Sequence, residues 1–433
     1  MSYKAHIATL LLICFGVFEV QSVEQTKTGY NLGILPAISF NSDEGFQYGA
    51  ILNLFNYADG SRYPKYDHSY YLEGSKYTKG STVLRFYLDS DKLLEGIRTF
   101  ADVSYIDESL LDFYGFNGYQ SVYDPNIEQT NRAFYKLSQK QYRLLLDFKG
   151  PTPLQNMYWT SSINIVRYKD APVNYDKLNS NPDYPDIQPG LSLYEKYRDW
   201  GLIQPDEANG NFITALKAGL IIDSRDRLNN PSTGIYTEAI VELAPEALNK
   251  NPYSRFSILH RQYVELVKNK LNFAGRLGIQ GRMGGHRIPF YRLPVMMSPF
   301  ANRTNPTGLG GASSLRGILR NRITGDITSL GNLELRWKAV NFKLANQNIY
   351  IGFNTFADAG YILKPLELDL SRVPALEKPI YFDLQTKESV HSSIGFGIKL
   401  AMNENFVISG EWGSSLDERD GKSGMYINLN YLF

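Results

Sequence analysis

The chain has 433 residues, of which 45 are Lys or Arg and 44 are Asp or Glu, so its net charge is +1. No long block of one sign occurs, and nucleic-acid binding is not indicated. Mean hydropathy is −0.30. After residue 22 no run of about 18 apolar residues occurs, which argues against a membrane-spanning helix.

The N-terminal segment has the features of a secretory signal. Lys4 precedes a largely apolar run from Ile7 to Phe18, and Val20-Gln21-Ser22 offers a cleavage point after a small residue. We therefore expect a signal peptide over residues 1–22, followed by one domain over residues 23–433. Cys14, the only cysteine, lies within this signal, so no disulfide is expected in the mature chain.

Alternation of apolar and polar residues recurs along the rest of the chain, as in amphipathic strands. About sixteen strands are predicted, over residues 31–40, 46–57, 69–77, 81–89, 99–106, 135–148, 157–168, 212–223, 235–243, 256–267, 271–283, 330–339, 349–358, 391–400, 406–412 and 425–433. An even strand number is usual for single-chain bacterial outer-membrane barrels. The 31 Tyr and 23 Phe residues could supply the two aromatic girdles of such a barrel.

The connections between these strands alternate in length. With the N-terminus in the periplasm, the outward connections are long, and the periplasmic ones, such as residues 149–156 and 268–270, are short. The long ones include residues 107–134, 169–211, 284–329 and 359–390. This asymmetry is typical of outer-membrane barrels. The predicted fold class is therefore all-β, a single transmembrane antiparallel β-barrel in the bacterial outer membrane.

Strand periodicity also assigns residues to the interior. In the segment 271–283, Arg276 is predicted to face the lumen and Leu277 the lipid. Glu334 and Asp358 likewise face inward, while Arg316 lies on the glycine-flanked loop from Gly310 to Ile318. We expect Arg316 to bind both carboxylates. This contact could fill and rigidify the lumen, or it could act as a latch that holds the loop against the wall.

Several motifs, in order, resemble a known family. They are Leu315-Arg316-Gly317-Ile318, Gly331-Asn332-Leu333-Glu334-Leu335-Arg336 and Phe356-Ala357-Asp358-Ala359-Gly360. Together they are similar to the C-terminal barrel of the BamA/TamA-type outer-membrane assembly and translocation proteins, also called bacterial surface antigens. The resemblance implies that Arg316, Gly317, Glu334, Asp358 and Gly360 form the loop-latch site. Leu315 and Ile318 depart from the family's valine and aromatic residue at the loop tip.

Two further motifs extend the resemblance. The segment Phe113-Tyr114-Gly115-Phe116-Asn117-Gly118 is similar to a motif of the third outer loop. A periplasmic turn of the family is matched by Asp223, Arg225, Asp226, Pro231 and Gly234. Between the signal and the first strand we expect no room for the periplasmic polypeptide-transport-associated (POTRA) domains of the family.

The resemblance implies insertion or translocation of protein at the outer membrane through a lateral seam between the first and last strands. Gly33 and Pro36 are expected to weaken pairing in the first strand, since proline lacks an amide donor. Tyr431 and Phe433 are assigned to the last strand, on one face with Met425, and this aromatic ending resembles an outer-membrane insertion signal. The alternative is a passive channel or a structural barrel.

The partners implied are outer-membrane lipids, unfolded outer-membrane protein clients and a separate periplasmic accessory protein. No cofactor and no metal site are predicted, because the histidines lack a metal-ligand spacing. His391 and Ser393 share a strand face, as an acyl-transfer pair requires, but no orienting acid is evident in the sequence. An enzyme is therefore not expected.

Overall fold

The computed structural model describes residues 26–180, 186–188, 190–228, 230–300, 308–344, 347–402, 406–429 and 431–433. The predicted signal peptide over residues 1–22 lies outside these residues. Within them, no helix combines the length and the apolar character needed to cross a membrane.

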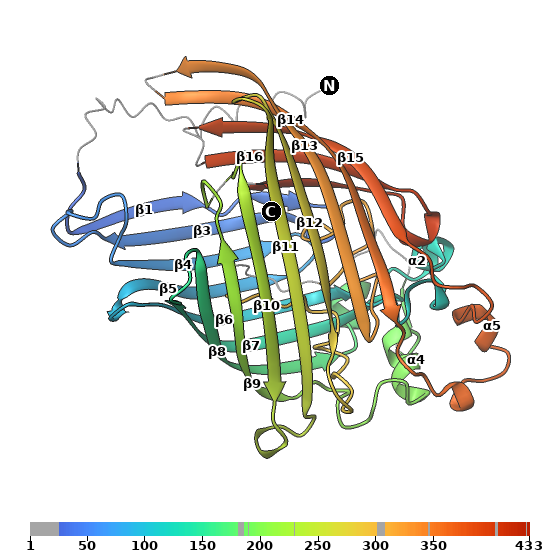
Figure 1. Cartoon of the computed structure of the whole chain (residues 1–433). Helices are drawn as coiled ribbons and strands as arrows, with labels where there is room; N and C mark the ends of the chain where they lie inside the picture. Colours follow the sequence, from blue (N-terminus) through green and yellow to red (C-terminus); the bar gives the residue numbers. More distant parts are fainter. Residues whose placement is uncertain are drawn as a thin grey trace.

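The strands form one antiparallel sheet that closes into a barrel (Figure 1). Its first strand is interrupted at Ala37 and Ile38 and is therefore divided into β1 and β2, so the barrel has sixteen strands, as predicted. The strands are β1 (Tyr30–Pro36), β2 (Ser39–Asn41), β3 (Gly45–Asn56), β4 (His68–Tyr77), β5 (Thr82–Leu94), β6 (Ile97–Asp112), β7 (Lys136–Pro151), β8 (Met157–Ala171), β9 (Phe212–Asp223), β10 (Gly234–Ala244), β11 (Tyr253–Val267), β12 (Leu271–Arg282), β13 (Ile327–Leu344), β14 (Gln347–Lys364), β15 (His391–Met402), β16 (Phe406–Ser415) and β17 (Ser423–Leu429).

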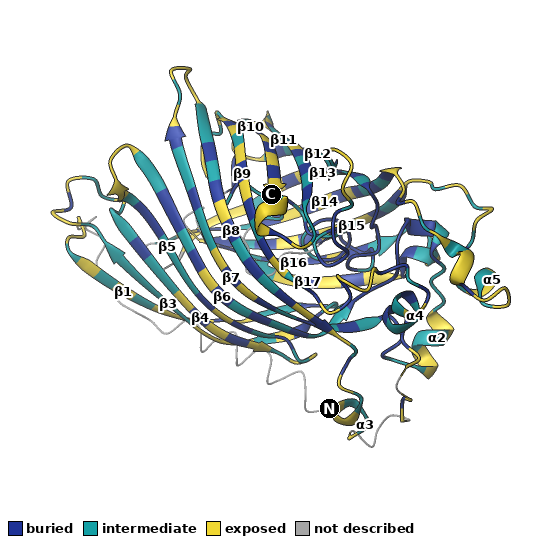
Figure 2. Cartoon of the chain, turned by 90° about the horizontal axis from the view of Figure 1, so that it is seen from below, coloured by how far each residue is buried: buried dark blue, intermediate teal, exposed yellow. Residues whose placement is uncertain are grey.

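The α-helices are short and lie in the connections. They are α2 (Pro125–Thr130), α3 (Tyr175–Asn179), α4 (Leu193–Asp199) and α5 (Lys378–Tyr381), accompanied by the 3-10 turns η1 (Gly118–Gln120), η2 (Glu246–Leu248), η3 (Leu370–Arg372) and η4 (Glu418–Asp420). The four α-helices gather at one end of the barrel, which we call the outer end (Figures 1 and 2). At the opposite end β11 and β12 are joined by residues 268–270 alone. As predicted, the connections over residues 113–135, 172–211, 283–326 and 365–390 are long and lie at the outer end. The outer turns after β2 and β4, however, are shorter than the periplasmic connection over residues 57–67, so the asymmetry holds only in part.

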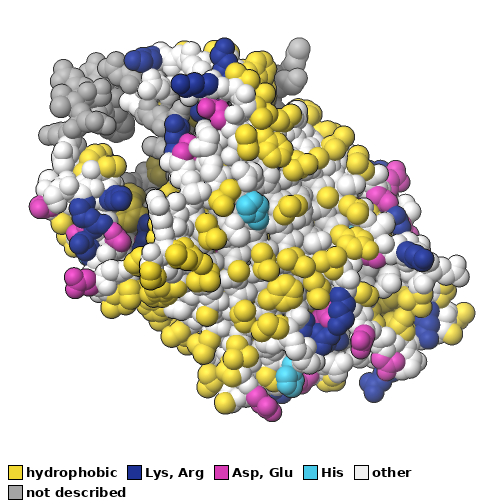
Figure 3. Space-filling model, in the orientation of Figure 1, with side chains coloured by type: hydrophobic (Ala, Val, Ile, Leu, Met, Phe, Trp, Pro, Cys, Tyr) yellow, Lys and Arg dark blue, Asp and Glu magenta, His cyan; other side chains and the backbone are white. Residues whose placement is uncertain are grey.

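Buried and exposed residues alternate along the strands, which gives the wall its striped appearance in Figure 2. In β12, Leu277 is 63% exposed on the outer surface, whereas the neighbouring Arg276 is 2% exposed. Hydrophobic side chains form a broad band over the strands, with charged side chains concentrated toward its edges (Figure 3). The band fits a hydrocarbon layer outside the barrel, and the lumen is polar.

The outer connections pack against one another around an aromatic cluster. Its buried members include Phe113, Tyr197, Phe290 and Phe382, which come from four different connections or their margins. Gly115 has φ +80°, and a Cβ atom there would lie 2.2 Å from the hydroxyl of Tyr197. Only glycine, which has no Cβ atom, allows Tyr197 to lie this close to the backbone. The outer connections therefore form one packed layer.

The third-loop motif belongs to this layer. The Asn117 side chain donates to the carbonyl of Leu366 at 2.9 Å and accepts from the Leu366 amide at 2.7 Å. The Asn117 amide also donates to the carbonyl of Thr324 at 2.7 Å. One asparagine thus joins three outer connections through backbone groups.

The first and last strands meet over a short length. β17 pairs with β2 at Tyr426–Asn41 and Ile427–Phe40, whereas β1 pairs with β3 from Tyr30 to Pro36. Gly33 and Pro36 lie on β1, whereas the two seam pairs lie on β2, beyond the interruption of the strand at Ala37 and Ile38. Among the described residues, the pairing of β17 with the first strand extends no further than Phe40.

The end of the chain differs from the prediction. The strand expected to reach residue 433 ends at Leu429. Beyond it, Phe433 is buried and Tyr431 half-buried inside the barrel, instead of continuing the exposed face of Met425 and Ile427. The Arg336 guanidinium lies 4.3 Å from the Tyr431 ring centroid and 5.1 Å from that of Phe433. Attraction of the two rings to this cation provides a physical reason for the inward turn.

We predict that Leu277→Arg destabilises the folded barrel by about 2–4 kcal/mol, because it places a cation on the lipid side of a strand near mid-membrane depth. The matched control is Leu376→Arg, on an outer connection where the side chain is 87% exposed, and it should change stability little. Urea titration of both variants in lipid vesicles measures the difference. Equal loss in the two variants would contradict the assignment of Leu277 to the lipid face.

Candidate functional site

The connection from Met283 to Asp326, which we call the sixth loop, enters the lumen with Arg316 near its tip. The Arg316 guanidinium lies 2.6 Å from a Glu334 oxygen on β13, 2.9 Å from an Asp358 oxygen on β14 and 2.8 Å from a Glu411 oxygen on β16. Its side chain is fully buried and lies 3.5 Å from the ring centroid of Phe356. The structure thus brings Arg316 to Glu334 and Asp358, and adds Glu411.

Glycines allow the loop tip to approach the wall. Gly317 has φ +88°, and a Cβ atom there would lie 2.6 Å from the backbone of Gly413 on β16. At Gly360 a Cβ atom would lie 2.6 Å from a methyl carbon of Leu315. Leu315 and Ile318 are both buried, in a cluster with Ile362. The loop tip is therefore packed against the wall by backbone and apolar contacts as well as by charge.

The charges around Arg316 balance. Arg336 lies 2.7 Å from Glu334, and Lys399 lies 2.7 Å from Glu411. Three cations, Arg316, Arg336 and Lys399, therefore accompany the three carboxylates. Burial alone would lower the pKa of Arg316, but attraction to Glu334, Asp358 and Glu411 raises it well above its ordinary value. Arg316 remains charged, and removing it would leave carboxylates without their shared partner.

Other arginines attach the same loop to different parts of the molecule. Arg320 lies 2.9 Å from Glu108 and 2.8 Å from Asp112 on β6. Arg322 donates to the carbonyls of Gly118 at 2.8 Å and Ser121 at 3.1 Å in the third outer loop. Neither arginine was recognised from the sequence. Had the predicted strand over residues 99–106 been continued to Glu108, its inward face would have indicated a carboxylate partner for Arg320.

The sixth loop also contacts both sides of the seam. The Gly317 amide donates to the hydroxyl of Tyr426 on β17 at 2.9 Å. The Ala312 amide donates to Asp43, in the turn between β2 and β3, at 3.4 Å, and Arg320 lies 3.7 Å from Glu44 in the same turn. One loop therefore links the first and last strands. None of Tyr426, Asp43 and Glu44 was recognised from sequence.

A cavity of about 450 Å³ lies between the seam and the sixth loop. Its lining includes Asp43, Glu44 and Glu411, with Pro36 from β1 and Tyr431 from the end of the chain. This places two of the four predicted seam residues, Pro36 and Tyr431, around one space. Gly33 and Phe433 are not part of its lining.

Phe433 lies deeper in the barrel. Its carbonyl oxygen accepts from Arg336 at 2.9 Å, and its ring centroid lies 5.0 Å from the Arg276 guanidinium. Because Arg336 also binds Glu334, a continuous set of contacts runs from Phe433 to Arg316. The inward-turned end is thus joined to the loop site.

The predicted periplasmic turn has its own internal contacts. Arg225 lies 2.8 Å from Asp223, and the Asp226 carboxylate accepts from the amides of Ser232 and Thr233. Gly234 has φ +100°, and a Cβ atom there would lie 2.3 Å from the Ser224 carbonyl oxygen.

Residues 230–232 of this turn, including Pro231, are buried. The Asn230 side chain donates to the hydroxyl of Tyr350 at 2.8 Å, and the Tyr350 and Tyr431 hydroxyls are 3.3 Å apart. The turn therefore reaches the end of the chain through Tyr350.

His391 has acid partners that the sequence did not reveal. Its Nδ1 lies 2.6 Å from Asp420 and its Nε2 lies 2.7 Å from Glu388, both on outer connections. The ring stacks on Tyr119 at 4.0 Å. Since both ring nitrogens bind carboxylates, neither is left to activate Ser393. Among the described residues, no group of three or more His, Cys, Asp or Glu residues could hold a metal ion.

Comparison with known proteins now defines the family. Residues 97–423 match the Omp85 superfamily domain. The chain belongs to the Omp85 superfamily. Its barrel therefore resides in the bacterial outer membrane, and membership supports, in general terms, a role in protein insertion or translocation there. No curated protein matches.

A solved structure of another protein shares the fold of this Omp85 barrel. BamA from Haemophilus ducreyi lacking POTRA domains 1–3 is 16% identical, with a TM-score of 0.57, over 99% of this chain and 79% of that chain. CdiB from Acinetobacter baumannii is 11% identical, with a TM-score of 0.43, over 93% of this chain and 66% of that chain. A bacterial polysaccharide outer membrane secretin is 9% identical, with a TM-score of 0.41, over 94% of this chain and 99% of that chain.

For this Omp85 barrel, we predict that Arg316→Gln lowers the free energy of unfolding by about 3–5 kcal/mol, because buried carboxylates lose their partner. The control is Arg419→Gln, which removes a partly exposed pair with Asp417 and should cost at most about 1 kcal/mol. Urea titration of the folded barrel in detergent measures both. Similar losses would show that the Arg316 contacts contribute no more than a surface pair.

The stability of the folded barrel is expected to depend on pH through Asp43. Burial raises the pKa of Asp43 to about 6, although Arg320 opposes the shift. The folded barrel therefore prefers protonated Asp43, and the resulting stability is present below about pH 4 and lost as the pH rises through 6.

Asp43→Asn should accordingly match the parent near pH 4 and exceed its stability by about 1–2 kcal/mol above pH 7. Thermal unfolding across this range is the measurement. Glu95→Gln, in the exposed turn between β5 and β6, is the control and should show no such trend. A stability difference between Asp43→Asn and the parent that does not vary with pH would contradict the prediction.

Proposed function

We propose that the protein inserts or translocates other proteins at the outer membrane by opening the seam between its first and last strands. The single observation that carries this proposal is the two-pair seam, Tyr426–Asn41 and Ile427–Phe40, with the sixth loop contacting both of its sides. By comparison, β7 and β8 pair from Ser138 to Pro151.

The energetics favour opening at this place. Lipid offers no hydrogen bonds, so each unpaired backbone group in it costs several kcal/mol, and parting long ladders is correspondingly expensive. Parting β17 from β2 separates two residue pairs and the hydrogen bonds between Ser42 and Met425 next to them. Gly33 and Pro36 add to this weakness in the proposal, since Pro36 has no amide to offer an approaching strand.

The exposed edge would then serve as a template. An incoming strand that pairs with a free edge satisfies backbone groups on both chains, as in other cases of strand addition. Tyr30, Leu32 and Ile34 on β1 are exposed and carry the apolar side chains that a strand in lipid requires. The proposed clients are therefore unfolded outer-membrane proteins.

In this mechanism the Arg316 site acts as a latch. Arg316 holds the loop on β13, β14 and β16, which lie on one side of the seam, while Arg320 and Ala312 bind the turn on the other side. Releasing the Asp43 and Glu44 contacts would free the first strand without moving the loop from the remaining wall. The inward position of Tyr431 and Phe433 keeps the end of the last strand out of the seam.

The partners in the proposal are outer-membrane lipids, the client chain and a separate periplasmic accessory protein that delivers clients. The turn from Asp223 to Gly234 offers the accessory protein a structured surface at the periplasmic end. No enzymatic activity is proposed, because the nitrogens of His391 are occupied by Asp420 and Glu388.

The proposal is tested by locking the seam with a disulfide. Phe40→Cys with Ile427→Cys places cysteines at opposed positions of β2 and β17, where antiparallel geometry suits a disulfide. Phe40→Cys with Phe46→Cys is the matched control, since it shares one cysteine but joins β2 to β3. Cys14 lies within the predicted signal peptide.

In cells that depend on the protein, oxidation should abolish its role in the seam variant, reduction should restore it, and the control should stay active. Full activity of the oxidised seam variant would eliminate lateral opening. The barrel would then be a passive channel or a structural element, and single-channel recording separates those two, because a passive channel gives a steady open current.

A further inference from the structure

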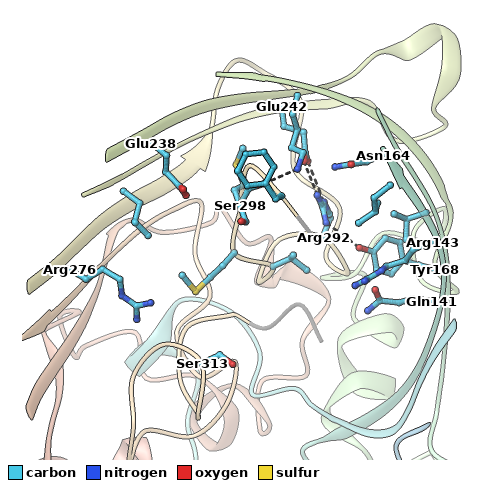
Figure 4. A pocket seen from close by; sticks show the side chains of 18 of the residues that line it. Gln141, Arg143, Asn164, Tyr168, Glu238, Glu242, Arg276, Arg292, Ser298 and Ser313 are labelled. Carbon is cyan, nitrogen blue, oxygen red and sulfur yellow. Dashed lines mark hydrogen bonds and ion pairs between the residues drawn. The ribbon is translucent and has the colours of Figure 1, made fainter. Parts of the chain in front are cut away.

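A second cavity, of about 160 Å³, lies on the other side of the sixth loop, against the wall from β7 to β12 (Figure 4). Ser313 lines both this cavity and the one beside the seam, so the loop divides the two spaces. The seam cavity is lined by three carboxylates and Arg320. The second cavity has the opposite character: its charged lining comprises Arg143, Lys217, Arg261, Arg276 and Arg292 with Glu238 and Glu242.

The carboxylates next to this lining do not remove the excess of positive charge. Glu242 is shared between Arg292 at 2.8 Å and Arg255 at 2.9 Å. Asp102 is shared between Arg143 at 3.1 Å and Arg85 at 2.6 Å. Lys217 lies 3.6 Å from Asp147. With Arg85, Arg255, Asp102 and Asp147 included, the described charged groups in and beside the lining still comprise seven cations and four carboxylates.

Of the cations that line this cavity, Arg261 has the fewest polar contacts with the described part of the protein. Among the residues that the structure describes it forms no ion pair, and its buried Nε atom has no hydrogen-bond partner. Its guanidinium lies 5.0 Å from the ring centroid of Tyr236, whose hydroxyl donates to Glu238 at 2.7 Å. Residues 301–307, which follow this part of the loop in the chain, contain no carboxylate. A buried donor without a partner is costly unless a ligand or water meets it.

We propose that this cavity binds a phosphate group, either as free inorganic phosphate or as the phosphate of a lipid headgroup. Arginine recognises phosphate through paired N–H donors, and an anion placed here would compensate the charge excess in a region shielded from bulk water. The Asn164 and Gln141 amides and Ser298 line the same space and add neutral polar groups. The cavity has room for one phosphate with several waters.

The site is independent of the seam. Its lining residues lie on β7 to β12 and on the sixth loop, and none comes from the first or last strand. Phosphate binding can therefore succeed or fail without deciding whether the seam opens.

The test is isothermal titration of inorganic phosphate into the folded full chain in a non-ionic detergent at low ionic strength. We expect saturable binding and an upward shift of the thermal midpoint with phosphate. Arg261→Gln should weaken binding at least tenfold. Arg98→Gln removes the same charge near the periplasmic end of β6, outside the cavity, and should leave affinity unchanged.

Titration with short-chain phosphatidic acid then distinguishes the two sources. Tighter binding of the lipid than of inorganic phosphate, with the same loss in Arg261→Gln, assigns a headgroup, whereas equal or weaker binding assigns free phosphate. Absence of phosphate binding to the parent, or equal affinity of Arg261→Gln and the parent, would overturn the proposal. If Arg261→Gln does not fold, Lys217→Gln replaces it and must show the same loss.

Discussion

Backbone pairing in lipid is the constraint on which the rest of this structure depends. A membrane-spanning sheet has to close, because an open edge leaves amides and carbonyls without partners. This barrel meets the requirement along nearly its whole circumference with long ladders, and at one place with two residue pairs between β17 and β2. The end of the chain, which could have lengthened the last strand, turns into the lumen toward Arg336 instead. Closure is thus weakest where the two ends of the sheet meet.

The sixth loop compensates for that weakness from inside. Its arginines bind separate parts of the wall, Arg316 near the last strands and Arg320 on β6, and its backbone contacts Tyr426 and Asp43 on the two sides of the seam. Charge is nearly balanced around Arg316 but not in the cavity near Arg261. One loop therefore joins the seam and separates an acidic space from a cationic one.

Much of the geometry around Arg316 follows from strand periodicity. Alternation placed Glu334 and Asp358 on inward faces, and a glycine-flanked loop allowed Arg316 to reach them. The same alternation could have indicated Glu411. The contacts of Tyr426 and Asp43 could not be predicted, because they depend on where the loop descends inside the barrel. The carboxylate partners of His391 could not be predicted either, because Glu388 and Asp420 belong to different connections that meet only when the outer layer packs.

The sequence by itself determined the strands, their lipid and lumen faces, the strand number and the long outer connections, since these depend on local alternation and on the chemistry of lipid and water. Only the tertiary structure decided how far the seam pairs, where Tyr431 and Phe433 lie, and how the loop divides the lumen. The expected strand to Phe433 shows the reason. Its alternation suits a strand with one face toward lipid. Contacts of the Tyr431 and Phe433 rings with Arg336, which is distant in sequence, compete with continued strand pairing.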